Sequence, residues 1–199
     1  DVLIPSFSSS VYLSKADDYA GETFYLIKEI YTSITINGTK LSSLVSNYDY
    51  DKDNKIDGIY FIINEFDMSK VNVNRFWAYT YWYIDTNCGY FAPNIPLATF
   101  CSLAGAFNYR DSYDGNDAHT LIHETGHMLG AEDYYSYDGE SRGYSGGLDM
   151  MDLNIGDHSA FTKYLFSWVK PYLLDLSSSL NKFEITLNTF ESSGDCLII

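Results

Sequence analysis

Positive charge is scarce in this chain of 199 residues, which has 12 Lys and Arg against 27 Asp and Glu. A formal net charge of -15 repels the phosphate backbone of nucleic acids and the surface of anionic membranes. The composition therefore excludes nucleic acid as a partner. Because such acidity is typical of secreted and calcium-rich proteins, we expect a secreted protein, or a cell-surface one as part of a longer chain.

Long apolar runs are also missing, since polar residues interrupt each run before it could span a bilayer. The first residues lack the basic start and apolar centre of a signal peptide. We therefore expect no membrane insertion, and we interpret the chain as an excised mature domain that is a monomer. Its length predicts one domain over residues 1–180, followed by a C-terminal strand or the start of another module over residues 181–199.

Cysteine is limited to Cys88, Cys101 and Cys196. An odd number without a C-x-x-C pair argues against a cysteine metal site and against a dense disulfide framework. Two interpretations remain for the first two residues. They form a disulfide if the segment between them doubles back, or they are buried free thiols.

One stretch carries recognisable chemistry: residues 123–133 read H-E-x-x-H-x-x-G-x-x-D. Positions four apart on a helix share a face, so His123 and His127 can hold one metal ion. Glu124 projects about 100° round the helix, beside the metal, where a general base for a metal-bound water is needed. The pattern predicts a zinc site.

The third ligand of this site has three candidates. Gly130 can adopt a left-handed conformation, end the helix and turn the chain back, so that Asp133 supplies a carboxylate. Glu132 and His158 are alternatives, because a ligand can also arrive from elsewhere in the chain.

An acidic stretch at residues 49–58 resembles a calcium loop over its first nine positions. It supplies four carboxylates: Asp49, Asp51, Asp53 and Asp57. The match then fails, since Asn54 replaces the usual Gly and Tyr60 replaces the final Glu. Asn tolerates the left-handed conformation, so the turn can still form. Calcium binding and a solvated acidic turn before a strand are both open.

Apolar periodicity predicts the remaining elements. Helical spacing indicates helices over residues 17–34 and 159–169, the second stopped by Pro171. Apolar, β-branched and aromatic runs indicate strands over residues 59–63, 76–84, 97–107 and 183–187. We expect the first of these strands to be central and covered on both faces. Asp117 is predicted to cap the helix of the metal motif.

Together these residues make the chain resemble the metzincin-type zinc endopeptidases, and most of all the immune inhibitor A family of secreted bacterial proteases. The similarity lies in residues 123–133, in Tyr134-Tyr135 after them, and in residues 148–151, which look like a methionine turn. The acidic loop before a strand and the closing residues 193–199 are also similar to that family. The resemblance covers residue 49 to the end.

The resemblance implies an α/β (α+β) fold with a twisted, mainly parallel sheet and an antiparallel edge strand. Helices would back this sheet, and the zinc helix would lie under it. Zinc would be held by His123, His127 and Asp133. Met150 or Met151 would form an apolar floor under the metal, and His158 would orient ligands.

The implied function is that of a secreted zinc endopeptidase. Glu124 would take a proton from the zinc-bound water for attack on a peptide carbonyl and pass it to the leaving amine. An extended protein or peptide substrate would pair with the edge strand. Two other functions are weighed against it: a noncatalytic extracellular calcium-binding or adhesion module, and a zinc amidohydrolase acting on small amides. Because Glu124 and both histidines are present, the enzyme is favoured.

Overall fold

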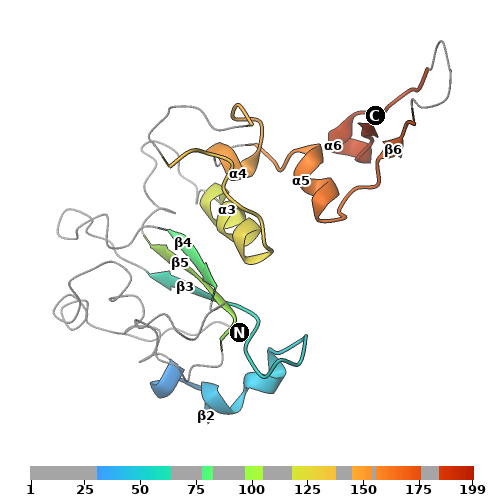
Figure 1. Cartoon of the computed structure of the whole chain (residues 1–199). Coiled ribbons are helices and arrows are strands. Elements are labelled where there is room, and N and C mark those ends of the chain that lie inside the picture. The colour runs from blue at the N-terminus through green and yellow to red at the C-terminus, as the bar shows by residue number, and fades with distance from the viewer. Residues whose placement is uncertain are drawn as a thin grey trace. The chain divides into compact units, whose positions relative to one another are not determined.

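The chain forms two compact units, Asp1–Gly130 and Ala131–Ile199 (Figure 1). The computed structural model describes residues 31–63, 78–82, 97–104, 118–137, 145–153, 156–175 and 184–199. Most of the helix predicted over residues 17–34 lies outside these segments, and its described end, residues 31–33, is helical. No helix among the described residues is both long and apolar enough to cross a membrane.

A three-stranded mixed sheet lies in the first unit (Figure 1). Strand β3 (Ile59–Ile63) runs parallel to β5 (Thr99–Ala104). Strand β4 (Tyr79–Trp82) runs antiparallel to the other side of β5. Strands therefore form within all three apolar runs predicted upstream of the metal motif. That this small sheet belongs to a metzincin-like fold stays a prediction.

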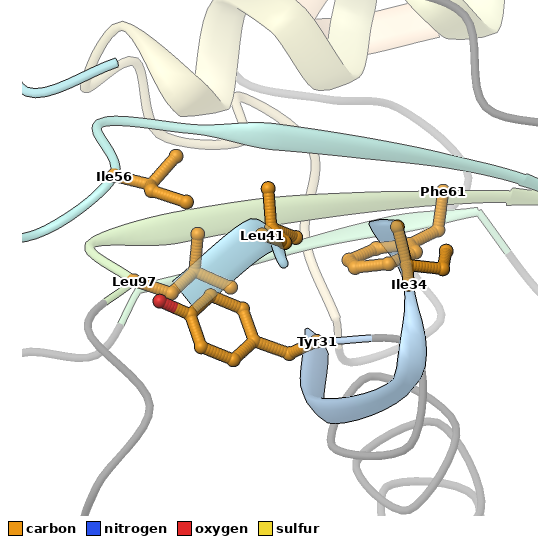
Figure 2. Packing of buried hydrophobic residues seen from close by; sticks show 6 residues of the cluster. All are labelled: Tyr31, Ile34, Leu41, Ile56, Phe61 and Leu97. Carbon is orange, nitrogen blue, oxygen red and sulfur yellow. The ribbon is translucent and has the colours of Figure 1, made fainter. Parts of the chain in front are cut away.

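The two faces of the sheet have different neighbours, because successive side chains of a strand point to opposite sides. One face packs on a buried cluster of Tyr31, Ile34, Leu41, Ile56, Phe61 and Leu97 (Figure 2). The opposite face packs against helix α3 (His119–Met128). Tyr60, Thr80 and Trp82 reach that helix from the strands. The alternation thus places the hydrophobic cluster on one face of the sheet and the polar contacts with α3 on the other.

The middle strand among those described is β5 rather than β3. The Ile62 side chain in β3 is 69% exposed. The prediction that residues 59–63 form a strand covered on both faces is therefore wrong. In β5, Cys101 has a free and fully buried thiol, so the buried-thiol interpretation holds rather than the disulfide. Cys88 itself lies outside the described residues.

A short hairpin precedes the acidic loop. Strands β1 (Thr35–Ile36) and β2 (Thr39–Lys40) pair in antiparallel fashion through Asn37 and Gly38. Both turn residues have positive φ, 49° and 80°, as expected for an Asn-Gly turn between two strands. Two 3₁₀ turns follow, η1 (Leu41–Ser43) and η2 (Val45–Asn47).

The second unit is built from short elements. It contains helices α4 (Met150–Leu153), α5 (Ala160–Leu165) and α6 (Phe190–Ser193). Strands β6 (Tyr172–Leu173), before α6, and β7 (Leu197–Ile198), after it, form a parallel pair. Residues 184–189 have no regular secondary structure, so the strand predicted over residues 183–187 is wrong in its described part. A domain boundary after residue 180 stays a prediction.

Helix α5 is shorter than the predicted span of residues 159–169. It starts as expected, with Ser159 in the N-cap position accepting a hydrogen bond from the Thr162 N–H. It ends well before Pro171, because Ser167 has a left-handed φ of 58°. The Trp168 N–H then donates to the Lys163 carbonyl at 2.8 Å, which closes the last turn. Local capping, not the proline, terminates the helix.

Candidate metal centre

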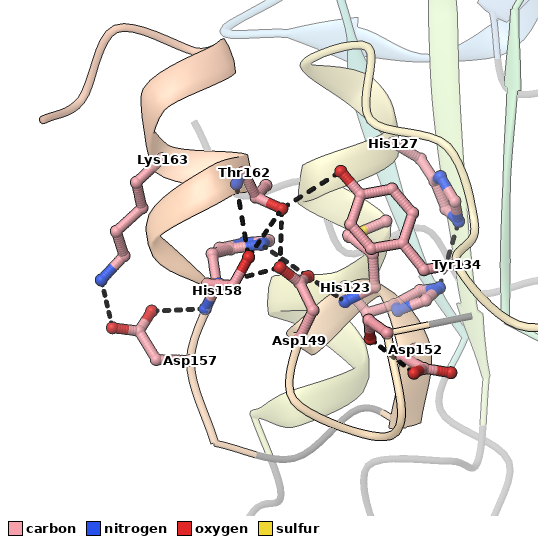
Figure 3. Close-up of polar contacts among 12 residues, drawn as sticks. His123, His127, Tyr134, Asp149, Asp152, Asp157, His158, Thr162 and Lys163 are labelled. Atoms are coloured by element: carbon pink, nitrogen blue, oxygen red, sulfur yellow. Dashed lines mark hydrogen bonds and ion pairs between the residues drawn. The ribbon is translucent and has the colours of Figure 1, made fainter. Parts of the chain in front are cut away.

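Helix α3 buries His123, Glu124 and His127. The Nε2 atoms of the two histidines lie 3.1 Å apart, and in Figure 3 the two rings turn toward each other. Two nitrogens bound at about 2.0–2.1 Å to a tetrahedral zinc would be about 3.4 Å apart. The spacing therefore suits two ligands of one ion, and it also permits a hydrogen bond between two neutral imidazoles.

The chain turns directly after this helix. Gly130 has a φ of 100°, and its N–H donates to the His127 carbonyl at 2.8 Å. The predicted left-handed turn at this glycine is confirmed. Within this continuous stretch Asp133 follows, and one ligand atom from each of His123, His127 and Asp133 lies within 4.8 Å of the others. Two imidazoles and one carboxylate are a donor set that fits Zn²⁺.

The two alternative third ligands are placed differently. Glu132 is exposed, and among the described residues neither it nor His158 belongs to this group. The Nδ1 atom of His158 lies 3.8 Å from a carboxylate oxygen of Asp149. Burial lowers the pKa of His158, although the negative charges of Asp149 and Asp157 oppose this shift. Its role in orienting zinc ligands stays a prediction.

Two tyrosines contact the Asp133 carboxylate. Tyr137 donates a hydrogen bond to Asp133 Oδ2, and its ring packs edge-on to Tyr135 with centroids 5.3 Å apart. Burial raises the pKa of Tyr135, and the negative charge of Asp133 raises it further. The Tyr135 phenol therefore stays protonated at neutral pH, and Tyr137 donates to the same carboxylate. Sequence reasoning gave Tyr137 no role, because no periodic pattern marks this loop.

The Glu124 carboxylate has a partner on the sheet. Thr80 Oγ1 in β4 lies 2.9 Å from Glu124 Oε2 and 2.9 Å from the Glu124 carbonyl oxygen. Trp82, two residues along the same strand, packs its ring against His127 with centroids 5.9 Å apart. Neither contact was predicted, since both join segments more than forty residues apart. Burial raises the pKa of Cys101 to about 12, helped by the charge of Glu124, so the thiol stays neutral.

The methionines of the predicted turn are both fully buried in α4. The Met151 N–H donates to Asp149 Oδ1 at 2.8 Å, and its carbonyl accepts from the Tyr134 N–H at 2.8 Å. Met150 and Met151 are thus core-filling residues of the second unit. Their place under a metal stays a prediction, as does the choice between them.

The acidic loop brings together three of its four predicted ligands. Carboxylate oxygens of Asp49, Asp51 and Asp53 all lie within 4.8 Å of one another. Asn54 has a φ of 67°, so the left-handed conformation expected at this position is confirmed. Its N–H and that of Asp53 donate to the Asp49 carboxylate, each at 3.0 Å. The loop therefore wraps round its first aspartate.

The fourth predicted calcium ligand of this loop is used elsewhere. Asp57 Oδ2 accepts a hydrogen bond from the Tyr50 N–H at 2.9 Å, and Asp57 is not part of the carboxylate group. Lys55 forms an ion pair of 2.9 Å with Asp53, which lowers the pKa of that carboxyl through their side-chain hydrogen bond. A calcium ion would have to compete with this lysine.

A scan against protein-family models found no match, and searches of curated proteins and of solved structures found no significant similarity. The residues described above are therefore the basis for a functional proposal.

Proposed function

We propose that this protein is a secreted zinc endopeptidase that hydrolyses peptide bonds of protein or peptide substrates. One observation carries the proposal: the Nε2 atoms of His123 and His127 lie 3.1 Å apart, and the buried carboxylate of Glu124 stands beside them on the same helix. Two imidazoles at ligand spacing next to a carboxylate are what the activation of water for amide hydrolysis requires.

Each residue has a distinct role in this proposal. A Zn²⁺ ion held by His123, His127 and Asp133 would polarise the scissile carbonyl and acidify water. Glu124 takes the proton from the attacking water and delivers it to the leaving amine. A carboxylate ligand such as Asp133 would lower the net charge on the metal, so a metal-bound water would be less acidified than with three histidine ligands. Glu124 must therefore do more of the proton transfer.

Strand β4 supports a polymeric substrate over a small amide. It pairs with β5 along one side, and no other described strand pairs with its outer side. The backbone groups of an outer strand can pair with an extended peptide. Because such pairing needs several peptide units in succession, the arrangement favours an endopeptidase that binds the substrate backbone first and its side chains second.

The test is digestion of casein and of a short amide by the full chain, with and without a zinc chelator. We expect casein cleavage that stops on chelation and returns when zinc is added. Hydrolysis of the short amide alone would instead indicate an amidohydrolase. Calcium binding without any hydrolysis would indicate the noncatalytic module, and casein cleavage that survives chelation would exclude a zinc mechanism.

Calcium binding by the acidic loop is a second candidate function. It is favoured by the convergence of Asp49, Asp51 and Asp53 around a left-handed Asn54. The ion would be held by oxygen ligands ahead of strand β3, where it would order the entry into the sheet.

A further inference from the structure

Three side chains form a row across the sheet on the face that meets α3. The register places Tyr60 opposite Cys101, and Cys101 opposite Thr80. The Tyr60 hydroxyl lies 2.9 Å from Thr125 Oγ1, while Thr80 lies 2.9 Å from Glu124 Oε2. The two outer members of the row thus contact consecutive residues of the helix.

Tyr60 and Thr80 have different effects on the helix. Thr125 donates its hydroxyl hydrogen to the Leu121 backbone carbonyl at 2.6 Å, one turn earlier in α3. The Tyr60 contact therefore links β3 to the backbone of the helix through Thr125. The Thr80 contact reaches the carboxylate of the residue that has the catalytic role in the proposal above. A glutamate side chain has three rotatable bonds, and burial by itself does not select one orientation of its carboxylate. A hydrogen bond from outside the helix does, because it fixes one carboxylate oxygen.

The Thr80 hydroxyl meets Glu124 at two atoms, and it also contacts the Cys101 thiol. Its single hydroxyl hydrogen is within reach of two acceptors of the same residue, Glu124 Oε2 and the Glu124 carbonyl, each at 2.9 Å. A bond to the carbonyl alone would only fasten the helix to the strand. Because the one hydrogen is shared between the two acceptors, its contact with Oε2 also restricts the orientation of the Glu124 carboxylate.

We infer that Thr80 is a positioning residue for Glu124, whose hydroxyl holds the Glu124 carboxylate in the orientation that proton transfer needs. The inference rests on the proposed function. Thr80 does not touch the reacting atoms, and it acts only through Glu124. Its loss should therefore reduce kcat and leave both KM and the zinc content unchanged.

The first arm of the test compares two substitutions in the full chain. Thr80→Val keeps the branched shape without the hydroxyl, and Thr80→Ser keeps the hydroxyl. Because a hydrogen bond to a charged group is at stake, Thr80→Val should lower kcat of casein cleavage by about 10- to 100-fold. Thr80→Ser should restore most of it. Equal kcat in Thr80→Val and the parent, or equal losses in both variants, would overturn the inference.

A matched control separates positioning from general support of the sheet. Thr99 in β5 also uses its hydroxyl on a backbone carbonyl, that of Tyr81 at 2.8 Å. Thr99→Val should lower the unfolding temperature without lowering kcat. If Thr99→Val reduced kcat as much as Thr80→Val, the effect would be structural and the inference would fail.

The second arm needs no zinc and no activity. Unfolding midpoints in urea are compared, in the metal-free chain, for the parent, Thr80→Val, Glu124→Ala and the double variant. We expect the two changes to be non-additive, because the Thr80 hydroxyl loses its contact with the Glu124 carboxylate when Glu124 is shortened. Additive effects would show that the carboxylate contact is absent and would overturn the inference whatever the enzyme does. Non-additivity in a chain that cleaves nothing would refute the proposed function, and with it any catalytic role of Thr80.

Discussion

The Thr162 hydroxyl donates a hydrogen bond of 2.6 Å to the Asp149 carboxylate, and both side chains are fully buried. The same carboxylate accepts from the backbone N–H groups of Met151 and Ser159, each at 2.8 Å. Figure 3 shows the contact between Thr162 and Asp149. Asp149 thus joins the start of α4, with its two buried methionines, to the start of α5. A buried charge is tolerated here because donors surround it on both sides.

Removing the Thr162 hydroxyl should destabilise the protein. Thr162→Val leaves a buried carboxylate short of one donor, which typically costs about 1.5–3 kcal/mol. Thr162→Ser keeps the donor and should lose much less. Urea unfolding followed by circular dichroism measures both values. Equal stability of the parent and Thr162→Val would contradict the importance of this contact.

The stability of the protein should fall in acid partly through Asp149. Burial alone would raise the pKa of this carboxyl, but the hydrogen bonds from Thr162, Ser159 and Met151 outweigh it, so the pKa is lowered. The stabilisation is therefore present above the unfolded-state pKa of about 3.9. It is lost as the pH falls through the lower folded-state value. Asp149→Asn should be less stable at neutral pH, and its stability should fall less than that of the parent when the pH is lowered. If its stability fell as much as that of the parent, other carboxyl groups would be responsible for the acid dependence.

Glu124→Ala should abolish most proteolysis without removing zinc. The side chain lies beside the histidine pair on α3, and Asp133 completes the proposed ligand set without it. Casein cleavage and metal content are measured on the same preparation. Retained cleavage would exclude Glu124 as the general base, whereas loss of zinc would make it a ligand.

Two neighbouring acidic residues provide a matched test of the third ligand. Asp133→Ala should weaken zinc binding by about 100-fold or more, since loss of even an outer-sphere partner costs 10- to 100-fold. Glu132→Ala should leave the affinity unchanged, because that side chain is exposed and lies outside the histidine group. Competition with a chromogenic chelator gives both affinities. The reverse result would move the ligand to Glu132.

Calcium should raise the melting temperature if the acidic loop binds it. For a dissociation constant near 10⁻⁴ to 10⁻³ M, 10 mM calcium would stabilise the fold by roughly 1.5–3 kcal/mol. Asp51→Asn removes one of the three converging carboxylates and should abolish the shift. Asp195→Asn, a change in the second unit, is the control and should preserve it. A shift that survives Asp51→Asn would place the calcium site elsewhere.

The parts that sequence alone determined are those in which neighbours along the chain decide the outcome. His123 and His127 share a face because four residues make about one helical turn. Gly130 and Asn54 adopt positive φ because these residue types tolerate it, and both were expected to. The strand at residues 59–63 follows from its run of five apolar residues.

Only the tertiary structure decided which distant residues meet. Nothing local marks Thr80 as the partner of Glu124, forty-four positions away, because the contact depends on the register between β4 and β5. Asp149 and Thr162 likewise meet only once α4 and α5 have formed. Residues 183–187 alternate like a strand, yet their described part, residues 184–187, has no regular secondary structure, and β6 pairs with β7. The hydrophobic periodicity of a segment shows which of its side chains can be buried together. Whether that segment pairs as a strand depends on which other strands the fold places beside it.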